Sequence, residues 1–247
     1  MTRRVALVTG GGGAIGSAIS AALAARECAV AVVDLRADTA SRVAADLDGA
    51  LAVTADLTDP AQVEAAAAAV RARLGPIEIL VNAAGWDEFV PFTDTDEDFW
   101  DRVIEVNYKA MLRTCRAVVP AMTEQGWGRI VNVASDAGRV GSSLEAVYAG
   151  AKGGVIAFSK SLAREVARHG VTVNVVCPGP TDTPLIRGMA ERMDGGERML
   201  DGLTRAIPLR RLAQPADIAP AVAYFAGEDA GYVTGQTLSV SGGLTMA

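Results

Sequence analysis

The sequence predicts an α/β fold: a single doubly wound (Rossmann) domain over residues 1–247, with a seven-stranded parallel sheet and helices on both faces. Short apolar runs alternate with helical segments along all 247 residues, which is typical of parallel strands joined by crossover helices. A glycine-rich turn follows the first apolar run, as in dinucleotide-binding units. No internal repeat, linker or low-complexity segment divides the chain, so we expect one domain.

Composition narrows the classes of partner. Half of the residues are hydrophobic and 21% are charged, which supplies material for a sizeable core. The formal net charge of −6 argues against nucleic acid or anionic membranes as partners. The three cysteines lack metal-ligand spacing, so no metal site is expected. Residues 5–25 follow two arginines but contain four consecutive glycines, which argues against a signal peptide or membrane span and favours a soluble, cytoplasmic protein.

The first predicted unit is a strand at 5–8, a glycine loop and a helix at 17–26. Glycines let the backbone approach a pyrophosphate closely, and the amino terminus of the helix attracts its negative charge. A merely flexible loop is the alternative, but the setting between strand and helix favours a phosphate site. Two known glycine spacings are present, G-x-G-x-x-G at Gly11, Gly13 and Gly16, and G-x3-(G/A)-x-G at Gly10, Ala14 and Gly16.

The second predicted strand, 29–33, ends at Asp34, 18 residues beyond Gly16. This is near the expected position of an acid that accepts hydrogen bonds from the adenosine ribose. A carboxylate there repels a 2′-phosphate, so NAD is predicted rather than NADP. Arg36 is the opposing feature, because a nearby arginine can accommodate that phosphate. A turn or helix-capping acid is the alternative for Asp34.

The remaining elements follow in alternation. Residues 185–211 are rich in Gly, Met and charge, and they are expected to form a lid over the carboxyl edge of the sheet. Asn107 falls inside a predicted helix, where asparagine is neutral to unfavourable, so either a functional role or a buried hydrogen-bonded side chain is expected. We predict strands at 51–55, 77–81, 129–134, 171–176 and 236–241, and helices at 60–73, 97–122 and 215–226. A further helix carries Tyr148 and Lys152 and runs to about 168.

The candidate catalytic pair is Tyr148 and Lys152. Residues four apart project from one face of a helix, and an ammonium beside a phenol lowers the pKa of that phenol. Reaching about 7 from near 10 would take about 4 kcal/mol, with help from a cationic cofactor ring. The phenol could then serve as a general acid–base, while Ser135 holds the substrate oxygen. Only three of the 23 basic residues are lysines, which suggests that position 152 requires an ammonium.

These motifs together resemble the short-chain dehydrogenase/reductase family over the whole chain. The glycine turn, Asp34, Asp56, Asn82-Ala83-Ala84-Gly85, Asn107, Ser135, Tyr148-x3-Lys152 and Pro178-Gly179 occur in family order and spacing. The resemblance implies that Tyr148 is the acid–base, that Ser135 polarises the substrate oxygen, and that Lys152 tunes the tyrosine and binds the nicotinamide ribose. Asn107 would hold a water of the proton relay. The reaction implied is reversible hydride transfer between NAD and a carbinol carbon, commonly in a homotetramer.

The resemblance adds further residues to those already singled out and completes the predicted site. Thr183 would contact the nicotinamide carboxamide. The substrate side would comprise Ser135, Tyr148, Trp86, Arg139, Ser142 and Glu145. The predicted cofactor contacts are Gly10, Gly12, Gly13, Ile15, Gly16, Asp34, Asp56, Leu57, Asn82, Ala83, Gly85, Tyr148, Lys152, Pro178, Gly179, Thr181 and Thr183.

A narrower resemblance concerns the substrate. Residues 85–89, 135–143, 176–183 and 239–245 look like the 2-hydroxycyclohexanecarboxyl-CoA dehydrogenase group, which oxidises a ring alcohol to a 2-ketocyclohexane thioester. The lid arginines would then bind the phosphates of a CoA thioester. The alternatives are a 3-oxoacyl-thioester reductase and an oxidoreductase for free cyclic alcohols and ketones. A non-catalytic nucleotide-binding protein is a remote alternative, because Asn107, Ser135, Tyr148 and Lys152 are all present.

Overall fold

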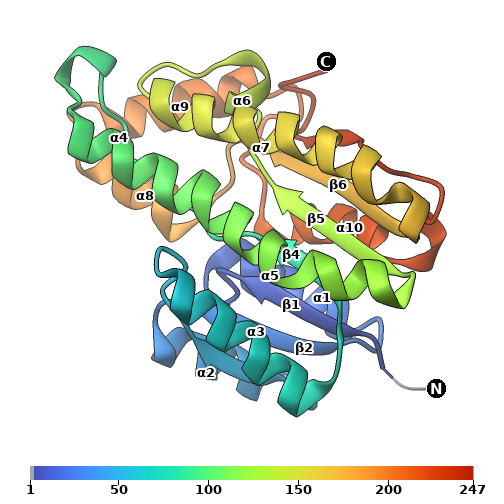
Figure 1. Ribbon diagram of the computed structural model, residues 1–247. Helices are drawn as coiled ribbons and strands as arrows, with labels where there is room; N and C mark the ends of the chain where they lie inside the picture. Colours follow the sequence, from blue (N-terminus) through green and yellow to red (C-terminus); the bar gives the residue numbers. More distant parts are fainter. Residues whose placement is uncertain (1–2, 247) are drawn as a thin grey trace.

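The computed structural model describes residues 3–246 as one α/β domain (Figure 1). Its centre is a seven-stranded sheet in the order β3-β2-β1-β4-β5-β6-β7, and every neighbouring pair of strands is parallel. The predicted fold class is therefore confirmed. The strands are β1 (Val5–Thr9), β2 (Ala29–Asp34), β3 (Leu51–Thr54), β4 (Ile77–Asn82), β5 (Gly128–Val133), β6 (Val171–Pro178) and β7 (Thr237–Val240).

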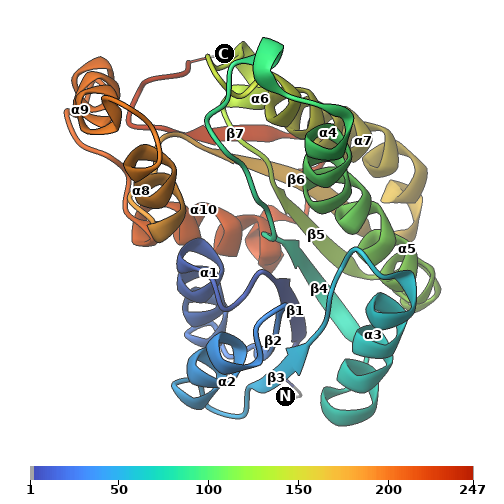
Figure 2. The ribbon, with the colours of Figure 1, turned by 90° about the vertical axis from the view of Figure 1, so that its left-hand side faces the viewer.

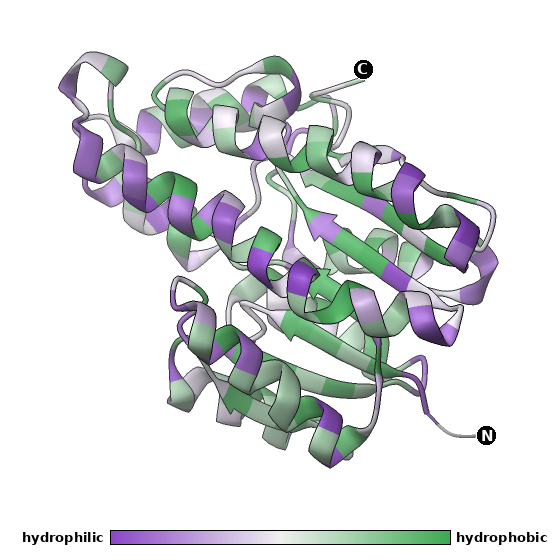
Figure 3. Cartoon of the chain, in the orientation of Figure 1, coloured by the Kyte–Doolittle hydropathy of each residue, from purple (hydrophilic) through white to green (hydrophobic). Residues whose placement is uncertain are grey.

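Helices cover both faces of the sheet (Figure 2). One face packs against α1 (Ala14–Ala24), α2 (Ala37–Ala45) and α10 (Pro215–Ala226). The other packs against α3 (Pro60–Leu74), α5 (Ala110–Gln125) and α7 (Ala146–Val166). The central strands are buried on both sides and mostly hydrophobic, whereas polar residues gather on the outer helices (Figure 3). Between residues 3 and 246, no helix is both long and apolar enough to cross a membrane.

The lid segment contains two helices, α8 (Pro184–Glu191) and α9 (Gly196–Ala206). Thr183 caps the first of them by accepting a hydrogen bond from the Ile186 N–H at 3.3 Å. A Cβ added to Gly196 would lie 1.9 Å from the Ala190 carbonyl oxygen, so the two helices meet too closely for any other residue there. Figure 1 shows both helices beyond the carboxyl ends of the strands, in the region where the sequence predicts a lid.

The predicted helix at 97–122 is interrupted. The structure has α4 (Glu97–Ile104), then the π-helical turn η2 (Glu105–Lys109), then α5. Asn107 lies in η2, and its Nδ2 donates to the Val103 carbonyl at 2.9 Å. The amide side chain therefore donates a hydrogen bond to a backbone carbonyl one turn earlier in the same helix, at the place where the backbone hydrogen bonds change from the α-helical to the π-helical pattern. Such π-turns are rare and are frequent at functional sites.

A chain of buried polar side chains crosses the core from α5 to α7. Thr114 donates to Asn82 at 2.6 Å, Asn82 to Asn132 at 2.8 Å, and Asn132 to Ser159 at 2.8 Å. All four residues are nearly or fully buried. Because each link is satisfied, the chain fixes α5, β4, β5 and α7 relative to one another.

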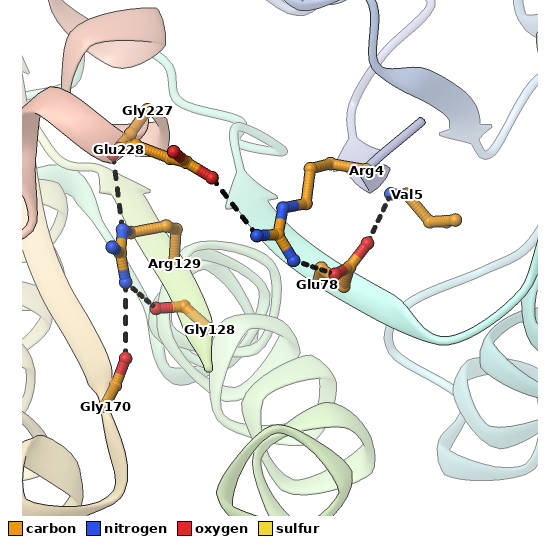
Figure 4. Close-up of polar contacts among 8 residues, drawn as sticks. All are labelled: Arg4, Val5, Glu78, Gly128, Arg129, Gly170, Gly227 and Glu228. Carbon is orange, nitrogen blue, oxygen red and sulfur yellow. Dashed lines mark hydrogen bonds and ion pairs between the residues drawn. The ribbon is translucent and has the colours of Figure 1, made fainter. Parts of the chain in front are cut away.

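A second polar cluster closes the opposite edge of the sheet (Figure 4). Arg4 forms ion pairs with Glu78 on β4 and with Glu228 after α10. Arg129, which is 5% exposed, donates to the Gly128, Gly170 and Gly227 carbonyls at 2.8, 3.3 and 3.3 Å. Burial and the charge of Arg4 lower the pKa of Arg129. This cluster lies where the strands begin, away from the edge at which ligands of such sheets bind.

Candidate active site

The carboxyl ends of β1, β4, β5 and β6 meet at one edge of the sheet (Figure 2). The chain order reverses between β1 and β4, which makes a switch point where open parallel sheets bind ligands. Gly10 follows β1, Asn82 ends β4, and Ser135 follows β5 by two residues. The fold thereby brings the glycine loop, the serine and the asparagine motif together, although they are far apart in sequence.

The glycine loop after β1 fits a pyrophosphate. Gly10 has a positive φ of 62°, and a Cβ there would lie 2.8 Å from the Ala84 backbone. A Cβ on Gly16 would lie 2.1 Å from the Gly10 carbonyl oxygen. Helix α1 begins at Ala14 with Gly13 as its N-cap, without a capping side chain and without an acid in its first turn. Its first N–H groups and the positive end of its dipole can therefore hold an anion.

Asp34 has two roles in this loop. One carboxylate oxygen accepts from the Gly12 N–H at 3.0 Å, and the other accepts from the Arg36 N–H at 3.0 Å and the Thr39 hydroxyl at 3.3 Å. A carboxylate oxygen accepts up to two hydrogen bonds, so the oxygen facing Gly12 can accept one more from a ribose hydroxyl. Arg36 is exposed at the start of α2. The loop can thus accommodate a dinucleotide with Asp34 beside its ribose.

The predicted contacts beyond the glycine loop are held by local hydrogen bonds. Asp56 accepts from the Thr58 N–H and hydroxyl at 2.8 and 2.7 Å, and the Leu57 carbonyl accepts from Arg113 at 3.3 Å. The Asn82 side chain is already hydrogen-bonded to Thr114 and Asn132, so only the main-chain atoms of Asn82 remain for a contact with a cofactor. The Thr181 hydroxyl donates to the Gly179 carbonyl at 2.9 Å. A Cβ on Gly179 would lie 2.8 Å from the Ser241 side chain.

Tyr148 and Lys152 lie one turn apart on α7, as predicted. The Lys152 Nζ is 5.5 Å from the centre of the Tyr148 ring and donates to the Val133 carbonyl at 3.1 Å. Lys152 is 4% exposed, and burial lowers its pKa to about 8, opposed by Cys177 and Asp87. The ammonium is therefore held by the Val133 carbonyl of β5, and its pKa lies only slightly above neutral pH.

The pKa of Tyr148 departs from the predicted direction. Burial raises it, and Glu145 and Asp87 raise it further, while a hydrogen bond with Ser135 lowers it. The protein's own groups therefore hold the phenol protonated. Burial and two acids outweigh the hydrogen bond with Ser135, so the predicted shift of the Tyr148 pKa toward 7 would need the cationic cofactor ring.

Asn107 is turned toward the same region by η2. Its Nδ2 donates to the Trp86 carbonyl at 2.6 Å, and its Oδ1 accepts from the Trp86 N–H at 3.2 Å. A Cβ on Gly85 would lie 3.0 Å from this Oδ1 and 3.5 Å from the Lys152 Nζ. Gly85 therefore leaves the amide and the ammonium on either side of one small space. The Asn107 Oδ1 keeps one lone pair for a water or hydroxyl.

The predicted substrate residues do not all converge. Glu145 and Tyr148 line one pocket. Ser142 is exposed and donates to Glu145. Trp86 packs against Phe99 at 5.8 Å, with the Arg102 guanidinium 3.7 Å from its ring. Arg139 instead donates to Ser239 on β7 at 2.7 Å.

Asp87 is the one acidic pocket residue that was not predicted as a site residue from the sequence. Asp87 is 3% exposed and lines the pocket beside Glu145 and Tyr148. Burial raises its pKa to about 8, and the charge of Glu145 adds to this. In the sequence, Asp87 is marked only by its position two residues after the Asn-Ala-Ala-Gly motif that follows a predicted strand. Because an acid in a polar loop is usually exposed to solvent, that position did not indicate a buried carboxyl group.

The arginines of the lid segment differ in whether their guanidinium groups have a partner within the protein. Arg187 pairs with Asp182 at 2.5 Å, Arg192 with Glu88 at 3.5 Å, and Arg211 with Asp217 at 2.5 Å. Within residues 3–246, Arg198 and Arg205 are exposed and form no ion pair. Only these two have guanidinium groups free of a local partner, since Arg210 donates to the Arg205 carbonyl.

Comparison with known proteins places the chain among characterised enzymes. Residues 12–245 match the family described as "Enoyl-(Acyl carrier protein) reductase". The chain is 38% identical to the 3-oxoacyl-(acyl-carrier-protein) reductase FabG of Escherichia coli strain K12, with 98% of both chains covered. It is 37% identical to an acetoacetyl-CoA reductase of Allochromatium vinosum, with 98% of this chain and 99% of that protein covered. The crystal structure of levodione reductase superposes with a TM-score of 0.94 at 30% identity, covering 98% of both chains.

Proposed function

The chain belongs to the short-chain dehydrogenase/reductase family, and from that premise we propose that it interconverts a 3-oxoacyl thioester and the corresponding 3-hydroxyacyl thioester. It is a short-chain ketoreductase/dehydrogenase that uses a nicotinamide cofactor. The observation that carries the proposal is the convergence of Ser135, Tyr148, Lys152 and Asn107 beside a pyrophosphate-binding loop. The narrowest form of the proposal is the 2-hydroxycyclohexanecarboxyl-CoA and 2-ketocyclohexanecarboxyl-CoA pair, because that ketone is itself a cyclic 3-oxoacyl thioester.

The proposed chemistry assigns one task to each residue. The bound dinucleotide supplies or accepts a hydride at its nicotinamide C4. Ser135 donates a hydrogen bond to the substrate oxygen, and Tyr148 gives that oxygen a proton during reduction or takes it during oxidation. Lys152, fixed by the Val133 carbonyl, stabilises the phenolate that reduction leaves. The Asn107 Oδ1 holds a water that returns the proton through Lys152.

We propose NAD as the preferred cofactor, because Asp34 stands beside the loop and no basic side chain lies within it. The change Asp34→Ala is expected to raise KM for NADH about tenfold or more, because a charge-assisted hydrogen bond to the ribose is lost. KM for NADPH should change less, since removal of the carboxylate also removes its repulsion of the 2′-phosphate.

Steady-state kinetics with both cofactors check this prediction. Because Asp34 also accepts a hydrogen bond from the Gly12 N–H, the KM for NADPH shows whether the variant has disordered the glycine loop as a whole. A wild-type protein that binds NADPH more tightly than NADH would contradict the proposal for NAD.

The thioester proposal draws on the similarity to the FabG protein and to an acetoacetyl-CoA reductase, and on the two unpaired lid arginines. Its direct test is reduced-cofactor formation by the purified protein with 2-hydroxycyclohexanecarboxyl-CoA, 3-hydroxybutyryl-CoA or free cyclohexanol. Preference for either thioester supports the proposal, and preference for the cyclic one supports its narrowest form. Turnover of the free alcohol alone would keep the chemistry and discard the thioester.

The lid arginines give an independent prediction. The double variant Arg198→Gln/Arg205→Gln is expected to have a higher KM for a CoA thioester. Each lost arginine should contribute a factor of about two to five, because an exposed contact with a phosphate is worth up to about 1 kcal/mol. KM for a free cyclic alcohol should stay within error.

The matched control is Arg73→Gln, an exposed arginine in the last turn of α3, at the opposite edge of the sheet. Equal effects on the thioester and the free alcohol would argue against phosphate binding by the lid. Measurements at two salt concentrations should show the effect shrinking as salt rises.

A free cyclic ketone is the second candidate substrate, favoured by the match to levodione reductase over the full chain. Glu145 and Tyr148 line a pocket whose other walls include the apolar side chains of Val90, Phe99 and Leu144. The homotetramer and the cytoplasmic location stay predictions.

A further inference from the structure

Asp87 stands out among the buried side chains because it has no structural role that accounts for it. It is 3% exposed, and neither carboxyl oxygen makes a hydrogen bond of normal geometry with a donor of residues 3–246. It caps no helix and joins no ion pair there. A buried polar group left without a partner destabilises the folded protein, so a purely structural site would favour an apolar residue.

The second member of the pair is Glu145. It precedes α7 as the N-cap residue, is partly buried, and accepts from the exposed Ser142. The two carboxyl groups lie within hydrogen-bonding reach, and their interaction is among the causes that raise the pKa of Asp87. Because burial and the neighbouring Glu145 raise the pKa of Asp87 to about 8, Asp87 carries a proton near neutral pH beside the Glu145 carboxyl group. The pair therefore offers a ligand both a donor and acceptors.

The pair and Tyr148 line the same small pocket, which has both polar and apolar walls. Asp87, Glu145 and Tyr148 line this pocket together with Val90, Phe99 and Leu144. Apolar walls with a few convergent polar groups are typical of small-molecule sites. The charges of Asp87 and Glu145 both act on the pKa of Tyr148, so the three groups are close. Lys152 does not satisfy Asp87, because within residues 3–246 no hydrogen bond or ion pair joins the two side chains.

We propose that the Asp87–Glu145 pair binds a second oxygen function of the substrate, a carbonyl or a hydroxyl, on the carbon two positions away from the carbon that reacts at Tyr148. This inference rests on the proposed function and narrows it: the preferred substrates are bifunctional, and a simple ketone leaves the pair without a partner. A 3-oxo thioester presents such a second oxygen in its thioester carbonyl. The pair thereby selects substrates by their oxygen pattern, separately from the residues that react.

The test compares substrates with and without the second oxygen. Ethyl 2-oxocyclohexanecarboxylate supplies a second carbonyl, 3-hydroxycyclohexanone supplies a hydroxyl, and cyclohexanone supplies neither. Asp87→Leu is expected to lower kcat/KM about tenfold or more for one or both bifunctional ketones, and less than about threefold for cyclohexanone. Asp87→Asn keeps a donor and an acceptor, so it should retain most of the activity that the Leu variant loses.

Controls separate recognition from folding. Asp101→Asn removes an exposed acid on α4 and should change none of the three values. Thermal unfolding of each variant shows whether the fold persists. An equal loss on all three ketones, or no loss on any of them, would overturn the inference.

The proposed function can fail separately. If wild-type protein reduces none of the three ketones, calorimetric titration of 3-hydroxycyclohexanone and cyclohexanone in the presence of cofactor still tests the pair. Weaker binding of the hydroxyketone alone in Asp87→Leu then supports recognition without turnover. Identical binding by the wild type and Asp87→Leu would overturn it.

Discussion

Replacement of Tyr148 by Phe is expected to lower kcat by about 10³-fold or more while cofactor affinity stays within about twofold. The change deletes the hydroxyl that exchanges the proton, and general acid–base catalysis contributes about 10²–10⁴-fold. The ring that lies 5.5 Å from the Lys152 ammonium is kept. Steady-state turnover and a fluorescence titration with reduced cofactor measure the two quantities on the same preparation.

The control for Tyr148→Phe is Tyr224→Phe, which removes the hydroxyl of a 40% exposed tyrosine on α10 and should leave both quantities unchanged. Turnover by Tyr148→Phe within tenfold of wild type would show that another group exchanges the proton. A large loss of cofactor affinity would instead show that the phenol hydroxyl is mainly a binding group.

Lys152→Met is expected to do two opposite things: to reduce turnover by about 10²-fold or more, and to raise the free energy of unfolding by about 1–3 kcal/mol at pH 7.5. Burial lowers the pKa of Lys152 from 10.5 to about 8. Keeping the ammonium in the folded protein at low pH therefore costs about 3 kcal/mol. A neutral side chain of similar length escapes that cost but leaves the Val133 carbonyl without its donor, which reduces the gain.

The pH dependence provides the sign test. Between pH 8 and pH 10.5 the unfolded chain binds more protons at Lys152 than the folded chain does, so this group makes the protein more stable as pH rises. The stability advantage of Lys152→Met over wild type should therefore shrink from pH 7.5 to pH 9.5. Burial and Glu145 act on the pKa of Asp87 more strongly than the charge of Lys152 does, so the contribution of Asp87 should change less than that of Lys152.

Urea unfolding at the two pH values measures the advantage. Lys160→Met, an exposed change on the same helix, is the control and should show no such trend. A Lys152→Met protein that is less stable than wild type at both pH values would mean that the hydrogen bond to Val133 outweighs the burial of the charge.

The sheet could be predicted from the sequence because its strands are short apolar runs with sharp ends. The run at 29–33 stops at Asp34, and the observed strand ends at that residue. Helix α2 was missed because its nine residues are short and mixed in polarity, and only tertiary packing identifies its buried face. The four-residue α6 (Ala137–Val140) was missed because a single turn has no periodicity.

The π-turn at Asn107 could be suspected but not predicted. An asparagine inside a helix indicated an exception, yet the sequence does not show which carbonyl its amide would take. That choice depends on Trp86, which reaches Asn107 from a loop 21 residues earlier. The residues proposed to react could be named from the sequence because chemistry restricts their types and spacing, and the structure places Tyr148 and Lys152 one turn apart on α7. Sequence reasoning missed Asp87 because burial, not residue type, makes that acid unusual.

The buried chain from Thr114 to Ser159 has a consequence for how the protein can change over evolutionary time. It anchors α5, which continues from the turn that holds Asn107, and α7, which carries Tyr148 and Lys152, to the same two strands. The surrounding walls at Asp87, Leu144 and the lid come from loops and short helices outside that anchor. Mutations in the walls can therefore exchange one substrate for another while the proton-transfer geometry is inherited unchanged, and new specificities need only loop replacement.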